Sequence, residues 1–185
     1  VGANQLQVNN GAALANAVSL DGGTVANTAG SGSLGGPVTL AGSNVLQSSA
    51  SGLLLSGTLG GTGSLSATGG SVTLSGTGNS HAGATAVSAG SLHLQGGTAI
   101  PDGSTVTLSG TAALVLGSSE TIGALAGVAG TSVSLGDNIL TTGGNSTPST
   151  SFLGVLSGGD SAGLVKAGGG SFSLAGANTY TGTTT

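Results

Sequence analysis

Short triplets of alternating apolar and polar residues recur along the whole chain. Each triplet puts two apolar side chains on one side of the backbone and usually a Ser, Thr or other polar residue on the opposite side, as in an extended strand with one buried face. Successive triplets start about twenty residues apart, and the gap before the last leaves room for one more near Leu153 to Leu156. The triplets are Val18–Leu20, Val38–Leu40, Leu53–Leu55, Val72–Leu74, Leu92–Leu94, Leu114–Leu116, Val133–Leu135 and Phe172–Leu174.

Glycine follows several apolar strands at a fixed distance, as in the pentads that end at Gly42, Gly76, Gly110 and Gly176. Glycine at this place predicts a sharp turn with positive φ. A short strand, a glycine corner and another short strand, repeated at a constant period, describe one coil of a β-solenoid. We therefore predict an all-β fold, a right-handed parallel β-helix with about 20 residues per coil and about nine coils, in a single segment over residues 1–185. With strands ~4.8 Å apart along the stack, the rod would be roughly 43 Å long.

Two other folds compete with the solenoid. An α-helix requires a 3.6-residue period and good helix formers, and 40 glycines in the chain exclude both. A β-sandwich also has short strands and frequent turns. The solenoid is favoured because whole pentads recur, whereas the strands of a sandwich seldom resemble one another.

The composition changes what kind of core is possible. Charged residues are 3% and aromatic residues 2% of the chain, and the aromatic residues are Phe152, Phe172 and Tyr180. The core must therefore consist of small and branched aliphatic side chains stacked coil upon coil. Intrinsic disorder is opposed by the mean hydropathy of +0.40 and by the ordered triplets.

The charge pattern excludes several partners. The formal net charge is −4 and Lys166 is the only Lys or Arg, so the clusters needed to bind nucleic acid or anionic lipid are absent. The chain has no Cys, which excludes disulfides and thiolate zinc sites and is compatible with export in an unfolded state.

The stretch from Gly163 to Thr185 resembles the passenger-associated transport repeat of autotransporters. That repeat has a Lys before a Gly-rich turn, an alternating strand, and then Gly-x-Asn-Thr-Tyr-Thr-Gly before a Thr-rich strand. The matching residues, which we predict to have a structural role, are Lys166, Phe172, Leu174, Gly176, Asn178, Thr179, Tyr180, Thr181 and Gly182.

A degenerate second copy runs from Gly69 to Leu94. After a one-residue insertion, Asn79, Gly83 and Thr85 stand roughly where Asn178, Gly182 and Thr184 do. Tyrosine is absent from this copy, and His81 lies near its place.

The resemblance implies a β-helical passenger that is exported by an outer-membrane β-barrel outside this chain, with repeats that assist secretion and folding. It also implies an extracellular or cell-surface location. Both ends of the chain look cut, so we expect a window onto a longer rod.

Candidate chemistry is sparse. His81 and His93 have no carboxylate near them in sequence, and His93 takes the outward position of its triplet. The five carboxylates are scattered, mostly beside glycine, and we interpret them as residues that accept backbone hydrogen bonds in turns: Asp21, Asp102, Glu120, Asp137 and Asp160. We predict no catalytic, cofactor-binding or metal-binding residues, and a protein that is not an enzyme.

Three further motifs match only by letter. Gly30–Gly35 fits G-x-G-x-x-G but lacks the helix and acid of a dinucleotide loop, and Gly60–Leu65 lacks the Asp of a calcium-binding repeat. Asn145–Thr147 is a glycosylation sequon in the loop Thr141–Ser151, which shows no strand pattern. That loop is a candidate binding excursion from the scaffold.

The leading functional hypothesis is a structural stalk or adhesin segment of a secreted bacterial autotransporter passenger, with a host-cell or matrix surface as partner. The alternative is a self-associating matrix or biofilm fibre protein, because so little charge leaves copies without mutual repulsion. A polysaccharide-active β-helix would need acids and bases clustered in one groove, and it is the remote third possibility.

Overall fold

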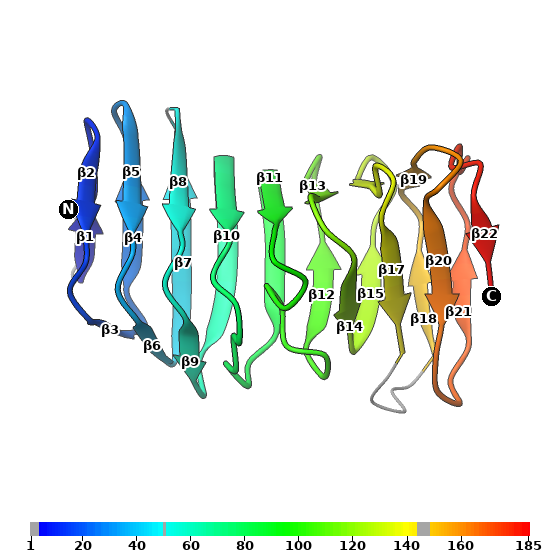
Figure 1. Ribbon diagram of the computed structural model, residues 1–185, viewed down its shortest axis with the longest axis horizontal. Coiled ribbons are helices and arrows are strands. Elements are labelled where there is room, and N and C mark those ends of the chain that lie inside the picture. The colour runs from blue at the N-terminus through cyan, green and yellow to red at the C-terminus, as the bar shows by residue number, and fades with distance from the viewer. Residues whose placement is uncertain (1–3, 50, 144–148) are drawn as a thin grey trace.

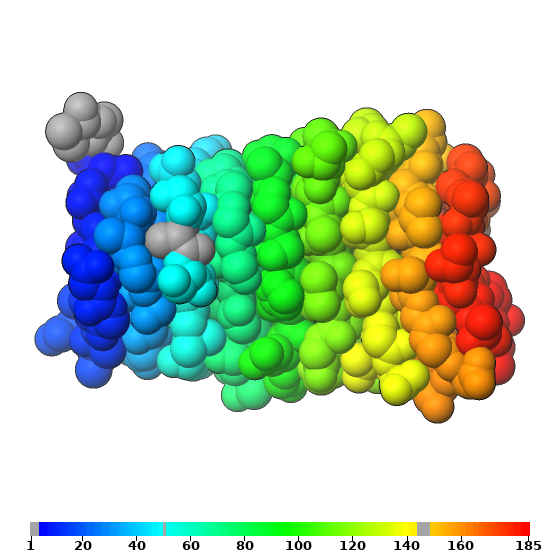
Figure 2. All heavy atoms as spheres, turned by 90° about the horizontal axis from the view of Figure 1, so that it is seen from above, coloured from blue at the N-terminus to red at the C-terminus, as the bar shows by residue number. Residues whose placement is uncertain are grey.

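The computed structural model describes residues 4–49, 51–143 and 149–185, and this part of the chain is all-β, without a helix. The chain winds into a rod, with the N-terminal coil at one end and the C-terminal coil at the other (Figure 1). In the space-filling view the coils lie against one another as successive bands along the rod (Figure 2). Every strand pairing is parallel, so the predicted β-solenoid is confirmed.

Each coil contributes strands to as many as three parallel ladders. The first ladder has nine strands: β1 (Gln5–Gln7), β4 (Thr24–Asn27), β7 (Ser43–Ser48), the first half of β10 (Ser64–Leu74), the first half of β11 (Thr85–Leu94), β12 (Thr105–Leu108), β15 (Ala124–Gly127), β18 (Thr150–Phe152) and β21 (Phe172–Leu174).

The second ladder adjoins the first, because β10 and β11 run through the corner between them. It comprises β2 (Ala12–Leu14), β5 (Ser31–Leu34), β8 (Gly52–Leu55), the second halves of β10 and β11, β13 (Ala113–Leu116), β16 (Ser132–Ser134) and β19 (Val155–Ser157).

The third ladder is divided into two sheets. The first sheet is β3 (Val18–Asp21), β6 (Val38–Ala41) and β9 (Leu59–Gly61). The second sheet is β14 (Glu120–Ile122), β17 (Ile139–Thr142), β20 (Gly163–Lys166) and β22 (Thr183–Thr184).

The coil period can be read from one inward column of the first ladder. This column runs from Leu6 to Leu174, which are 168 residues and eight turns apart, or 21 residues per turn. The predicted period of about 20 residues and the predicted nine coils are therefore close to the structure. The right-handed sense of the winding stays a prediction.

The core is a stack of buried Leu, Val, Ile and Ala side chains along the whole rod. Phe152 is its one fully buried aromatic side chain among the described residues. Its ring takes the space above two glycines: a Cβ on Gly127 would lie 2.5 Å from the ring, and one on Gly154 would lie 2.6 Å from it. The ring therefore fits where neighbouring residues have no side chain.

The triplets are correct as strands but do not form one ladder. Val18–Leu20 stacks on Val38–Leu40 in the third ladder, whereas Leu53–Leu55 begins a series in the second ladder that runs to Val133. Phe172–Leu174 lies in the first ladder. Period and alternation look the same on all three sides, so the sequence pattern does not distinguish them.

The additional strand expected near Leu153 to Leu156 is present as β19, where Leu156 stacks on Val133. Leu153 itself lies outside this strand and is 46% exposed.

The predicted positive φ at the corner glycines is right at Gly42 and Gly110, with φ of 64° and 61°, and wrong at Gly76 and Gly176. At Gly76 a Cβ would lie 2.2 Å from the carbonyl oxygen of Gly57 in the preceding coil, and Gly176 meets Gly154 in the same way. Glycine is needed there because two backbones approach closely.

Candidate functional site

Three asparagines hold their coils to the preceding coil by the same pair of contacts. One of them, Asn44 on Gly23, lies outside the two stretches that resemble each other in sequence, and its two bonds are 3.2 and 2.9 Å long. At the other two, Asn79 and Asn178, the bonded residue is a leucine. The Leu59 amide donates to Oδ1 of Asn79 at 2.7 Å, and the Leu156 amide donates to Oδ1 of Asn178 at 2.8 Å. The residue after each asparagine then donates its own amide to the carbonyl of that same leucine, at 2.8 Å in both places. We call this arrangement, made by Asn79 on Leu59 and by Asn178 on Leu156, the asparagine clamp.

A second contact recurs two residues after each clamp. Nε2 of His81 lies 3.3 Å from Oγ1 of Thr85, and the hydroxyl of Tyr180 lies 2.5 Å from Oγ1 of Thr184. His81 therefore takes the place of Tyr180, as the sequence indicated. The environments differ, since His81 is 1% exposed and Tyr180 only partly buried against the core.

Glycines flank both clamps for one physical reason. A Cβ on Gly83 would lie 2.4 Å from the Gly63 carbonyl oxygen, and a Cβ on Gly182 would meet the Ala162 carbonyl oxygen in the same manner. Gly76 and Gly176 occupy equivalent places before the clamps. Each clamp thus lies between two points where the chain touches the backbone of the preceding coil.

These two stretches are also the ones that a family model matches, at residues 69–94 and 164–185, under the description passenger-associated-transport-repeat. The chain carries two passenger-associated-transport repeats. No curated protein and no solved structure matches it.

The corresponding strands of the two repeats lie on different sides of the rod. The strand that opens the first repeat, Val72–Leu74, lies in the second ladder, whereas its counterpart Phe172–Leu174 lies in the first. The two leucines are 100 residues apart, which is not a whole number of 21-residue turns. The repeat is therefore a local unit that fits more than one side of the solenoid.

The remaining repeat residues predicted from sequence lie at the C-terminal end. Phe172 and Leu174 are partly buried against the core. The hydroxyl of Thr181 donates to Asp160 at 2.5 Å. Lys166 ends β20 and directs Nζ to the carbonyl oxygens of Ala167 and Gly168.

The structure does not bring the titratable residues together. No group of three or more His, Cys, Asp or Glu side chains suited to a metal ion exists among the described residues. His93 is on the outward side of β11, as predicted, with Nε2 3.0 Å from the Ser91 hydroxyl oxygen.

The interpretation of the carboxylates as turn residues is right in position for Asp102, Asp137 and Asp160, and wrong for Asp21 and Glu120, which lie in strands. The side chain of Asp160 accepts a hydrogen bond from the Thr181 hydroxyl. The carboxylate of Glu120 accepts the backbone amide of Ile100 at 2.7 Å, and Glu120 is 2% exposed inside a strand. Burial raises the pKa of Glu120 above its ordinary value.

The motifs that matched by letter are parts of the solenoid. Ser31–Leu34 is strand β5, with no helix after it, and the Gly60–Leu65 stretch spans the end of β9 and the start of β10. The sequon at 145–147 lies outside the described residues. The expected loop is shorter than predicted, because Thr141 belongs to β17 and Ser151 to β18.

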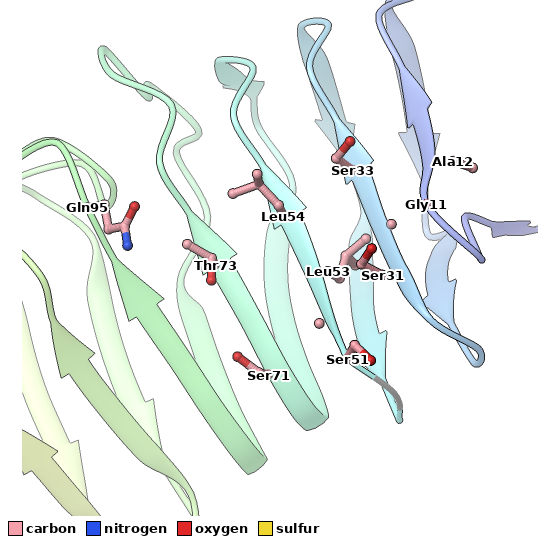
Figure 3. Close-up of a pocket in the computed structure, with 12 residues that line it drawn as sticks. Gly11, Ala12, Ser31, Ser33, Ser51, Leu53, Leu54, Ser71, Thr73 and Gln95 are labelled. Atoms are coloured by element: carbon pink, nitrogen blue, oxygen red, sulfur yellow. The ribbon is translucent and has the colours of Figure 1, made fainter.

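A shallow groove crosses the outer surface of the second ladder over its first coils (Figure 3). Its polar lining consists of Ser31, Ser33, Ser51, Ser71, Thr73 and Gln95, and Leu54, 38% exposed, lies among them. None of these five hydroxyls forms a hydrogen bond to another described residue. Sequence reasoning missed the groove, since the groove joins outward residues from separate coils.

Charge is distributed unevenly over the rod. The described strands of the first and second ladders contain no Asp, Glu, Lys or Arg. The charged residues that lie in strands are all in the third ladder: Asp21, Glu120 and Lys166.

Proposed function

We propose that this chain is a structural segment of the passenger of a secreted bacterial autotransporter, and that it supports secretion, surface display and adhesion. The observation that carries the proposal is the recurrence of the transport repeat on a β-solenoid. Both copies make the same clamp to the preceding coil. A rod built by such contacts suits a stalk, because each coil is stabilised by its neighbours.

Cell fractionation tests this proposal. The chain that contains the Asn178–Thr181 peptide should be found at the cell surface or in the culture fluid, in a species much heavier than 16.7 kDa. Recovery from the cytosol would contradict a passenger. Recovery as a free species near 16.7 kDa would contradict the stalk and favour the second function below.

We propose that the hydroxyl-lined groove is the surface that contacts the host cell or matrix during adhesion. Its strands carry no charge, so the ligand that it suits is uncharged and rich in hydrogen-bonding groups. A Thr73→Arg variant should reduce binding of cells to host cells or matrix. A matched Ser134→Arg variant, outside the groove on the same ladder, should bind as the parent does. Equal binding by all three proteins would exclude the groove.

A second candidate function is self-association into a matrix or fibre. The uncharged strands of two of the three ladders favour it, because no like charges on those sides keep copies apart. The purified chain should then sediment as salt-insensitive oligomers, and a charge in the outward position of β16, as in Ser134→Glu, should dissociate them. A monomer at high concentration would contradict this function.

A further inference from the structure

The third ladder is interrupted in the middle of the rod. Its first sheet ends at β9 and its second begins at β14, three coils further on. Between them, residues 79–82 and 99–101 form no strand. We call these two segments the seam. The first and second ladders continue past it without a break, through β10, β11, β12 and β13.

Side chains replace the backbone ladder at the seam. Within the described residues, no backbone-to-backbone hydrogen bond joins 79–82 to 99–101, or 99–101 to 120–122. The coils that contain residues 79–82 and 99–101 are joined instead by two side-chain hydrogen bonds, Gly78 N to Thr98 Oγ1 and Asn79 Nδ2 to the Ala99 carbonyl oxygen, both at 2.9 Å. The coils that contain residues 99–101 and 120–122 are joined by Gly97 N to Ser118 Oγ at 2.9 Å and by Ile100 N to Glu120 Oε1 at 2.7 Å.

Two ionisable side chains, His81 within the seam and Glu120 in the strand that follows it, each have one unpaired atom. Nδ1 of His81 and Oε2 of Glu120 are buried and have no hydrogen-bond partner. These are the two unpaired buried side-chain atoms in the described part of the chain. A buried polar atom without a partner is costly, and a buried charge costs more. The seam is therefore the place where a change of protonation has the largest structural consequence.

The titratable neighbours are few. Burial raises the pKa of Glu120, two backbone amides at Ile100 and Ala99 oppose this, and the negative charge of Asp102 adds to it. Burial alone lowers the pKa of His81, whose ring faces the neutral hydroxyl of Thr85. His93, the other histidine, is on the outward side of another ladder.

We propose that the seam is where the rod opens first, and that protonation of His81 or ionisation of Glu120 drives the opening while the other two ladders hold the coils together. The proposal is independent of the passenger function, because it rests on the hydrogen bonds and buried groups of these coils alone.

The two groups act in opposite directions with pH. The folded state disfavours the charged form of His81, so its contribution to stability is complete above the ordinary pKa of 6.5 and is lost as the pH falls through 6.5 towards the lowered pKa. The folded state favours the protonated form of Glu120. Its contribution is complete below the ordinary 4.5 and is lost as the pH rises through 4.5 to the raised pKa. Between these values the two changes oppose each other in the unmodified protein.

Amide hydrogen exchange measured on single-site variants separates the contribution of His81 from that of Glu120. Glu120→Gln keeps an acceptor for Ile100 but cannot ionise, so protection of the Ile100 and Gly97 amides should rise at pH 7, by about tenfold. In this variant protection should fall between pH 7 and 5. His81→Gln should show the opposite trend, with protection rising as the pH falls. His93→Gln, the matched control, should behave as the parent does.

In the parent, the amides of Gly97 and Ile100 should exchange before that of Leu125, which lies in the first ladder one coil away. Equal protection of these three amides would overturn the seam as the first point of opening. Glu120→Gln and His81→Gln profiles with the same pH trend as the parent would overturn the assignment of the trigger to these side chains. If either variant fails to fold, the order of amide exchange in the parent still decides whether the seam opens first.

Discussion

The two transport repeats make the same contacts in different surroundings. In the first, Asn79 joins three coils, because Oδ1 accepts from Leu59 and Nδ2 donates to the Ala99 carbonyl oxygen of the following coil. In the second, Asn178 makes the backward contact to Leu156 only. Asn79, His81 and Thr85 of the first copy are buried in the middle of the rod, whereas Asn178, Tyr180 and Thr184 of the second are partly or fully exposed in the C-terminal coil of the described chain. The contact to the preceding coil is therefore the shared element, and the contact forward depends on position.

This comparison predicts the largest effect at the glycines that follow the clamps. Gly83→Ala should destabilise the rod by about 3 kcal/mol or more, because its Cβ meets the backbone of a coil that is fixed on both sides. In the chain of residues 1–185, Gly182→Ala should cost less, because within the described residues its coil packs against the preceding coil only. Gly169→Ala is the control, with no atom within 4 Å of the added Cβ. Urea unfolding measures all three, and equal losses at Gly83 and Gly182 would contradict the comparison.

The asparagines should give the next largest difference. Asn79→Ala leaves the Leu59 amide and the Ala99 carbonyl without partners in a buried site, so a loss of about 2–3 kcal/mol is expected. Asn178→Ala removes one partly buried bond and should cost about 1 kcal/mol. Chemical denaturation is the measurement. A larger loss at Asn178 than at Asn79 would show that the forward bond contributes nothing.

Exchanging the aromatic residues between the repeats sharpens the comparison further. His81→Tyr inserts a larger ring into a fully buried site and should cost about 1–2 kcal/mol. Tyr180→His should cost less than about 1 kcal/mol, because the site is half-exposed. The His81→Tyr variant should also lose less stability below pH 6.5 than the parent. Unfolding curves at pH 7.5 and 5.5 measure both effects, and an unchanged pH dependence would contradict the burial argument.

The smallest effect belongs to the threonines that complete each repeat. Thr85 is 1% exposed and close to His81, so Thr85→Val should destabilise slightly, by less than about 1 kcal/mol. Thr184 is exposed, and Thr184→Val should leave the unfolding midpoint where it is. A thermal melt of both variants is sufficient. A measurable loss at Thr184 alone would reverse the expected order.

The sequence predicts the fold well because the solenoid is a periodic solution to burying small side chains. The spacing of Leu and Val and the recurrent glycines indicate the coil and its period, and the resemblance to the passenger-associated transport repeat locates both copies of the repeat. The distribution of the triplets over three ladders could not be predicted, because inward Val and Leu look alike on every side of the rod. Register, as between Leu40 and Gly61, depends on where the chain turns.

The partner of Glu120 could not be predicted from the sequence. Strand alternation places Glu120 on the same side as Ile122, but the backbone amide that its carboxylate accepts is that of Ile100 in the preceding coil. The close approach at Gly76 was likewise hidden, since a glycine in sequence does not reveal whether it serves a positive φ or a neighbouring backbone.

The most direct test of the account is the exchange rate of one amide. The Leu59 N–H donates to the side chain of Asn79. If the clamp holds the coils together, Asn79→Ala should accelerate exchange of the Leu59 amide by about tenfold more than that of the Val87 amide in the first ladder. Equal acceleration of both amides, or none at Leu59, would show that the repeat does not act by clamping the preceding coil.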